Sequence, residues 1–259
     1  MYKCEVFVSF HNLSHNERNI ILRIEEIHLK DDLEFDMEMA REYDKGIRRA
    51  LPTYDALFRM IQSFLRANVK EGASILVVGA GGGNEIVTFG TANPTWYFAG
   101  VDPSEAMLEV AMQKAKNEGI EKRVTIHTGT VEEVIFNKKF DAATCLLVLH
   151  FVETKEEKLS LLKTVKENLS PGAPFVLVTM YGDQSQPEFD ERMNLWKSIW
   201  LDLTNLTKED VEGMEESVRE LSFISSNEIE SLLEQAGFDR VTQFFSTTLF
   251  GGWIAHTKK

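Results

Sequence analysis

The feature of this sequence that most constrains its fold is a regular alternation of short apolar runs and longer amphipathic stretches. The apolar runs are rich in valine, isoleucine and leucine, and they occupy residues 73–78, 95–101, 123–129, 140–149 and 173–180. Buried strands that alternate with helices are joined by right-handed crossovers, which place the strands parallel to one another. The pattern therefore predicts an α/β fold with a doubly wound, mostly parallel sheet.

The end of the sequence departs from this alternation. The runs GFDRVTQFFS (237–246) and TLFGGWIAHTK (248–258) both read as strands, and one residue separates them. Such a tight connection predicts an antiparallel hairpin, which brings the expected sheet to seven strands. A helix precedes the hairpin, with Ser225 or Ser226 near its start.

Two segments lie outside the strand–helix rhythm. Residues 182–220 hold 11 acidic and four basic residues, yet they carry large apolar side chains at helical spacing, so we expect an acidic helical insertion above the carboxyl edge of the sheet. Residues 1–50 read as an N-terminal helical extension or cap, and residues 51–259 as the main domain. Residues 182–220 and part of 1–50 are expected to close over a substrate.

Charge and composition narrow the classes of function. The formal net charge of −13 opposes a surface that tracks phosphates, so nucleic acid is not an expected partner. The two cysteines, Cys4 and Cys145, cannot form a secreted-type disulfide framework. No apolar run is long enough to span a membrane or act as a signal peptide. A cytoplasmic protein is therefore expected, and the histidines show no metal-ligand spacing, so no metal is expected either.

The segment ILVVGAGGGNE is the strongest local signal. Glycines at 79, 81 and 83 follow a buried strand and precede a helix, where backbone without Cβ atoms lets a ligand approach closely. Asp102 follows the second strand; it is a candidate N-cap, and its carboxylate can accept hydrogen bonds from the two hydroxyls of a ribose. A dinucleotide fingerprint needs glycine at position 84, which is Asn84 here, and this counts against an NAD-dependent oxidoreductase.

Several segments together carry a resemblance to a known family. VVGAGGGNE, VDPSEAMLEVA, HTGTVEEV, FDAATCLLVLHFVE and LSPGAPFVLV, in this order and spacing and followed by the hairpin, resemble the class I S-adenosylmethionine (SAM) methyltransferases. The resemblance runs from about residue 50 to the end of the chain. It implies a Rossmann-like fold, SAM as the cofactor and methyl transfer as the reaction.

The resemblance also implies positions for the cofactor. Gly79, Ala80, Gly81 and Gly83 would line the methionine end of SAM, and Asp102 would hold its ribose. The other implied contacts are Pro103 and Met107 by the adenine, Thr130 and Val131 by its exocyclic amine, and Leu146 and Leu147 beneath the methyl group.

This sequence departs from the family at two of these positions. The family has an acidic residue two positions before the first glycine, where it helps to organise the amino group of SAM; here that residue is Val77. Glu85 or a backbone carbonyl is a candidate replacement. The acid that commonly follows the third strand is Thr130, whose hydroxyl can still accept a hydrogen bond.

RRALPTYDALFRMI and the hairpin also look similar to the carboxy-SAM synthases of tRNA wobble-uridine modification. That likeness would place Arg49 and Tyr54 near the methionine carboxylate or the methyl group, a role that suits a guanidinium fork. Those synthases pair the additional carboxylate with an arginine of the inserted segment, and residues 193–218 contain no arginine. A structural relationship is thus expected rather than the same reaction.

His150 and Tyr181 follow the fourth and fifth strands and are the candidate catalytic residues, His150 as a general base. Trp196 and Trp200 stand four residues apart in the insertion, where they would line an aromatic pocket, cage a cation or pack in the core. The sequence predicts a SAM-dependent methyltransferase with a small-molecule substrate. A SAM-binding protein without transferase activity stays open, as does a homodimer.

Overall fold

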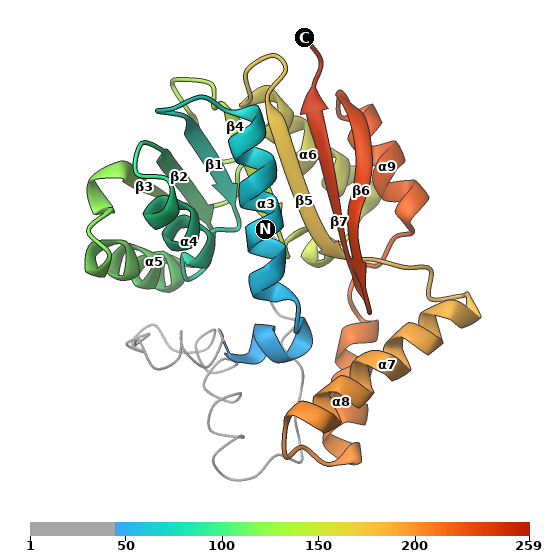
Figure 1. Ribbon diagram of the computed structural model, residues 1–259. Helices are drawn as coiled ribbons and strands as arrows, with labels where there is room; N and C mark the ends of the chain where they lie inside the picture. The colour runs from blue at the N-terminus through green and yellow to red at the C-terminus, as the bar shows by residue number, and fades with distance from the viewer. Residues whose placement is uncertain (1–44) are drawn as a thin grey trace.

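The computed structural model describes residues 45–259, which form one seven-stranded sheet with helices on both faces (Figure 1). The strands run in the order β3-β2-β1-β4-β5-β7-β6. Their bounds are β1 Ser74–Val78, β2 Tyr97–Asp102, β3 Val124–Thr128, β4 Ala142–Leu146, β5 Pro174–Met180, β6 Phe238–Thr247 and β7 Phe250–Thr257. The first five pair in parallel, and β7 is antiparallel to both β5 and β6. The predicted doubly wound sheet and its terminal hairpin are confirmed.

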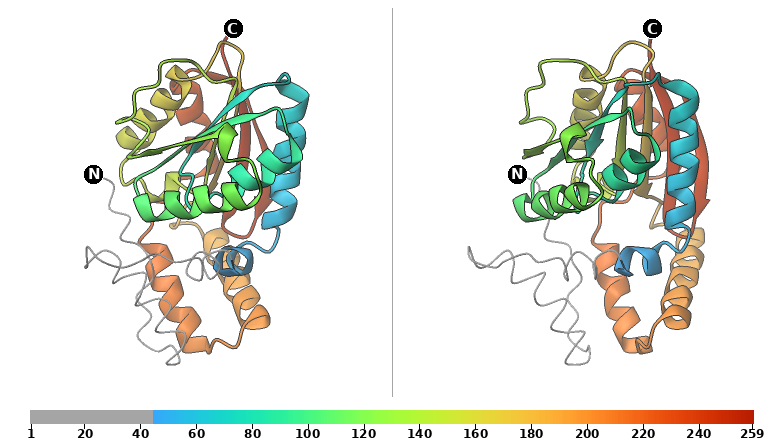
Figure 2. Two further views of the ribbon diagram at one scale, coloured as in Figure 1. Left: turned by 90° about the vertical axis from the view of Figure 1, so that its left-hand side faces the viewer. Right: turned by 60° about the vertical axis from the view of Figure 1, so that its left-hand side comes forward.

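Two layers of helices cover the sheet, as the turned views show (Figure 2). On one face α3, α4 and α5 supply apolar side chains to the core; on the other face α6 and α9 do so. The bounds of the helices are α3 Tyr54–Asn68, α4 Asn84–Ala92, α5 Glu105–Asn117, η1 Glu121–Arg123, η2 Leu149–Phe151, α6 Lys155–Glu167, α7 Pro187–Leu203, α8 Lys208–Arg219 and α9 Ser226–Gln235. Residues 45–50 are helical as well.

Local sequence accounts for several of these boundaries. Thr154, Thr207 and Ser225 are each the N-cap of a helix. The carboxylate three residues later accepts a hydrogen bond from the backbone N–H of the cap residue. The prediction that Asp102 caps α5 is wrong. Ser104 is the N-cap, and its hydroxyl accepts from the backbone N–H of Met107. Asp102 ends β2 instead, and this leaves its carboxylate at the edge of the sheet.

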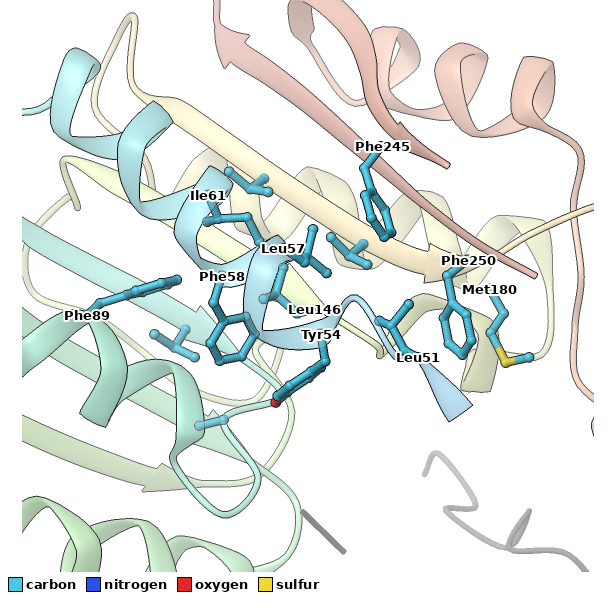
Figure 3. Close-up of a cluster of buried hydrophobic side chains, with 14 of the residues drawn as sticks. Leu51, Tyr54, Leu57, Phe58, Ile61, Phe89, Leu146, Met180, Phe245 and Phe250 are labelled. Atoms are coloured by element: carbon cyan, nitrogen blue, oxygen red, sulfur yellow. The ribbon is translucent and has the colours of Figure 1, made fainter. Parts of the chain in front are cut away.

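The central helix of the first layer is α3, whose buried stripe lies across the sheet (Figure 3). Leu57, Phe58 and Ile61 pack there against side chains from α4, β4 and the hairpin. Leu51, just before α3, lies beside Met180 and Phe250 at the ends of β5 and β7 (Figure 3). The buried stripe therefore fixes α3 along the sheet, with its first residues near the carboxyl edge and its last residue, Asn68, hydrogen-bonded to His256 at the opposite edge.

The acidic segment 182–220 forms α7 and α8, which extend beyond the carboxyl end of β5 (Figures 1 and 2). Its helical character is confirmed, and its role as a lid stays a prediction. The predicted extension 1–50 lies outside the described residues except for 45–50. Among residues 45–259, the model contains no helix of the length and apolarity that a membrane crossing requires.

Candidate active site at the carboxyl edge

The glycine loop connects β1 to α4 at the point where the strand order reverses between β1 and β4. Gly79 and Gly83 have φ angles of 71° and 77°. A Cβ on Gly79 would lie 2.1 Å from Val148 Cγ2, and one on Gly83 would lie 2.7 Å from the Cα of Ala111 in α5. These two glycines are thus required by close packing against the protein itself as well as by backbone conformation.

The N–H groups of the loop are largely used within the protein. Gly79 and Ala80 both donate to the carbonyl of Val101, at 2.9 and 3.0 Å, and Gly83 donates to the carbonyl of Ala80. The loop is therefore held against the end of β2. The loop therefore offers a ligand a fixed shape and a close approach to the backbone, and few of its N–H groups are left to donate hydrogen bonds.

Asp102 joins the loop to the start of α5. Its Oδ2 accepts from the N–H of Gly81 at 2.8 Å, and its Oδ1 accepts from the N–H of Ser104 at 2.9 Å. Burial raises the pKa of Asp102, and these two N–H donors offset part of that shift. Each carboxylate oxygen keeps a second lone pair. Asp102 is half-buried and turned toward the glycine loop, so a ligand at this edge can still reach those lone pairs.

The residues implied for the adenine lie at the same edge. Met107 is half-buried, and its Cε lies 3.5 Å from the position of a Cβ on Gly81. Pro103 is exposed, Val131 is buried, and Thr130 is half-buried, with its N–H donated to Glu133 at 2.8 Å. The ends of β2 and β3 are joined there by the N–H of Gly129, which donates to the carbonyl of Asp102.

Leu146 and Leu147 stand at the end of β4. Leu146 is buried in the core under α3, whereas Leu147 is half-buried and has a φ of 62°. A left-handed conformation costs a residue with a side chain roughly 1–2 kcal/mol. The N–H of Leu147 donates to the carbonyl of Val178 at 2.7 Å, which holds the turn in place. This turn ends the strand three residues before the predicted limit at 149.

Tyr54 approaches the glycine loop from α3 (Figure 3). The amide Nδ2 of Asn84 donates to its hydroxyl at 3.4 Å. Arg49 is exposed, whereas its neighbour Arg48 bonds the carboxylate of Asp55 and lies 5.2 Å from the ring of Tyr54. The sequence analysis singled out Arg49 and missed the contact of Arg48 with Tyr54. Two adjacent arginines cannot be told apart by spacing alone.

His150 is buried in η2, 4% exposed. Its Nδ1 lies 3.0 Å from the hydroxyl of Thr179 and 3.2 Å from the backbone nitrogen of Met180. Burial lowers the pKa of His150 to about 3, with a smaller contribution from the charge of Lys158. The hypothesis that His150 is a general base is not supported by this arrangement. The imidazole instead joins η2 to the end of β5.

Lys158, which the sequence did not single out, supports the same region. Its Nζ is fully buried and donates to the carbonyls of Leu149 and Val152. Tyr181 is also buried; its hydroxyl lies 2.9 Å from Ser246 Oγ, and the guanidinium of Arg192 lies 4.2 Å from its ring centre. These contacts join α7 to the hairpin and give Tyr181 a packing role in the structure.

Trp196 and Trp200 lie on the buried side of α7. Their rings are 5.9 Å apart at an angle of 74°, so they pack edge to face rather than as two walls of a cation cage. Both Nε1 atoms are buried without a hydrogen-bond partner.

Within residues 45–259, no group of three histidine, cysteine or acidic side chains is placed to hold a metal ion.

Comparisons with known proteins agree with this architecture. Residues 76–175 match a family model described as a methyltransferase domain. The carboxy-S-adenosyl-L-methionine synthase of Campylobacter jejuni is 24% identical over 238 residues, which cover 87% of this chain and 94% of that protein. For the Campylobacter curvus synthase, 24% identical over 148 residues, the match covers 57% of this chain and only 62% of the relative.

A solved structure with the same fold is a SAM-dependent methyltransferase from Geobacter sulfurreducens in complex with S-adenosyl-L-homocysteine. It is 19% identical with a TM-score of 0.50, and the match covers 72% of this chain and 64% of that one. At such identity the likeness concerns the fold alone. Taken together, the domain match, the synthase relatives and the strand order support a relationship to the class I SAM-dependent methyltransferases, whose fold this chain shares.

Proposed function

We propose that this protein binds SAM across the ends of β1 and β2 and transfers its methyl group to a small-molecule acceptor. The observation that carries the proposal is the Asp102 carboxylate, fixed between the N–H groups of Gly81 and Ser104. In this position its remaining lone pairs can accept from two neighbouring ribose hydroxyls. Bound SAM would supply the methyl group on a sulfonium sulfur, a good leaving group.

The residues at this edge fit such a cofactor. The glycine loop is tied to β2, so its shape does not depend on the ligand. Met107 is half-buried and would offer apolar surface to an adenine, and Val131 is buried in the core at the same edge.

The acceptor would lie beyond β4 and β5, between the start of α3 and the inserted helices. Leu51, Met180 and Trp196 are buried in one apolar cluster there. The two unpartnered indole N–H groups of α7 favour an acceptor that carries oxygen atoms, because each buried donor gains a hydrogen bond. The protein's contribution to methyl transfer is mainly to hold the acceptor in line with the sulfur.

Calorimetric titration with SAM, S-adenosylhomocysteine and NAD tests the cofactor. We expect the first two to bind and NAD not to bind. Asp102→Ala should weaken SAM binding by at least one hydrogen bond to a charged group, roughly 1.5–3 kcal/mol, or about 10- to 150-fold.

Asp141→Ala is the matched control. The Asp141 carboxylate also accepts a backbone N–H, from Ser74 at 2.8 Å, but at the opposite, amino edge of the sheet. Its loss should affect stability and leave SAM affinity unchanged. Equal SAM affinity of Asp102→Ala and wild type would overturn the proposal, as would binding of NAD in place of SAM.

A second candidate is carboxy-SAM formation, favoured by the relatives of that name. An additional carboxylate on the cofactor would need a guanidinium partner. The arginines of α7 and α8 are Arg192, held by backbone carbonyls of Thr248 and Tyr181, and Arg219, paired with Asp190 and Glu215. Mass spectrometry of the nucleoside that copurifies with the protein separates the two: SAM supports methyl transfer, and a carboxylated SAM supports the second candidate.

A further inference from the structure

A buried acidic side chain lies directly behind the glycine loop. Glu85 is in the first turn of α4, and 6% of its surface is exposed. Within residues 45–259, its Oε1 is buried and has no hydrogen-bond partner. A buried polar group without a partner is destabilising, and more so when it is charged, so this carboxyl group calls for an explanation.

The sheet register locates Glu85 relative to β1. Val77 pairs with Gly100 in β2 and with Thr144 in β4, so these three residues share one face of the sheet. A Cβ on Gly100 would lie 3.0 Å from the side chains of Ala80 and Ile86, which shows that α4 covers this face. The hydroxyl of Thr144 is the side-chain group that lowers the pKa of Glu85. Glu85 thus places an acidic side chain beneath the glycine loop, on the same face of the sheet as Val77 of β1.

We propose that the carboxylate of Glu85 pairs with the cationic methionine end of SAM, an assignment that rests on the proposed function. SAM carries two cations at that end, an ammonium group and a sulfonium sulfur, and either would supply the partner that Glu85 lacks. The first turn of a helix also favours a negative charge.

No cation of the described chain takes this place. Lys114 of α5 lies near the glycine loop, where its Nζ is 3.6 Å from the position of a Cβ on Gly82, but this Nζ donates to the side chain of Asn84 at 2.9 Å. Asn84 in turn donates to Tyr54 of α3. On β4, the buried Cys145 thiol has a raised pKa, caused by burial and then by the charges of Glu85 and Glu132. The side chain that β4 directs to the face of α4 is therefore the Thr144 hydroxyl, and the Cys145 thiol lies on the opposite face of the sheet.

Burial raises the pKa of Glu85 to about 8, and the Thr144 hydroxyl offsets only part of that shift. The group is therefore mainly protonated at neutral pH in the free protein. When a cation binds beside it, the ionised form becomes favoured. The O–H bond of the carboxyl then breaks, the proton goes to the buffer, and the carboxylate keeps the electron pair. At pH 7 the expected release is about 0.9 proton per bound ligand.

Proton release can be measured by titration calorimetry with SAM at pH 7 in two buffers of different ionisation enthalpy. The variant is Glu85→Gln, which has the shape of the protonated acid and is therefore expected to fold. We expect wild type to release close to one proton more than Glu85→Gln, and the variant to bind SAM at least tenfold more weakly. Glu105→Gln is the control, because Glu105 also lies in the first turn of a helix at this edge but is exposed; it should behave as wild type.

Two other ligands identify the cation. S-adenosylhomocysteine keeps the ammonium group and lacks the sulfonium, and methylthioadenosine lacks the amino acid entirely. Release with SAM and S-adenosylhomocysteine assigns the ammonium, and release with SAM alone assigns the sulfonium; methylthioadenosine should release none. Equal proton counts for wild type and Glu85→Gln, with SAM bound by both, would overturn the inference. If wild type bound no SAM at all, the proposed function would fail instead. If Glu85→Gln does not fold, the affinities of wild type for SAM and for methylthioadenosine can be measured between pH 6 and pH 9 instead. The inference expects the ratio of the two affinities to change with pH, and an unchanged ratio would refute it.

Discussion

The contact between the glycine loop and α5 can be tested through the stability of Gly83→Ala. Gly83 has a φ of 77°, and the added Cβ would lie 2.6 Å from Ala111 Cβ and 2.7 Å from Ala111 Cα. The left-handed conformation costs alanine roughly 1–2 kcal/mol, and overpacking adds about 1–3 kcal/mol. The backbone atom of Ala111 cannot rotate away, so we expect Gly83→Ala to lose about 2–5 kcal/mol of unfolding free energy.

Gly119→Ala separates the two contributions. Gly119 has a similar φ of 68°, but a Cβ there would meet no atom within 4 Å. This control should therefore cost only the conformational part, about 1–2 kcal/mol. Urea unfolding followed by circular dichroism measures both variants. If Gly83→Ala were no less stable than Gly119→Ala, the close approach of α5 to the loop would be refuted.

Three further perturbations follow from buried polar groups. Lys158 has its pKa lowered to about 8 by burial, so between pH 8 and its ordinary value of 10.5 the unfolded chain binds a proton that the folded protein does not. The free energy of unfolding should therefore rise with pH in that window, by at most about 1.4 kcal/mol per pH unit. Urea unfolding at several pH values should show this slope in wild type, and the same slope in Lys158→Met would contradict its assignment to Lys158. Burial raises the pKa of Cys145, so peptide mapping after iodoacetamide treatment should find it unmodified in the folded protein and modified in urea; fast labelling of the folded form would show that the thiol is accessible. Arg192→Ala removes a hydrogen bond from α7 to Thr248 in the hairpin, and a hydrogen bond and a ring contact to Tyr181, which follows β5. The expected loss is about 2–4 kcal/mol in thermal or urea unfolding, whereas Arg59→Ala, at an exposed position, should change little; equal stability of the two variants would argue against the Arg192 contacts.

Much of the sheet could be predicted because its central strands β1, β4 and β5 are almost completely buried, which gives continuous apolar runs, and because several of its turns contain glycine. The run 73–78 became β1 and 173–180 became β5, each within one residue. The fourth strand was predicted too long, since residues 147–149 are as apolar as the strand itself. What ends it is the left-handed Leu147, a conformation that depends on the carbonyl of Val178 and leaves no mark in composition.

The site was predictable to the extent that it depends on local spacing. A glycine loop after one strand and an acid after the next were expected to meet at one edge, and the N–H of Gly81 does donate to the carboxylate of Asp102; their role in binding stays a prediction. The environment of His150 depends on Met180, 30 residues away, and so its neutral, buried state could not be predicted from neighbouring residues.

The position of β7 between β5 and β6 has a consequence for folding. Because the last strand of the chain lies inside the sheet, β6 has no neighbour other than β7, and β5 keeps an open edge until β7 arrives. A nascent or truncated chain that stops before Phe250 therefore exposes unpaired backbone along a completely buried strand, the kind of surface that promotes aggregation. Completion of the hairpin is therefore the folding step that covers the open edge of β5 and removes this aggregation-prone surface.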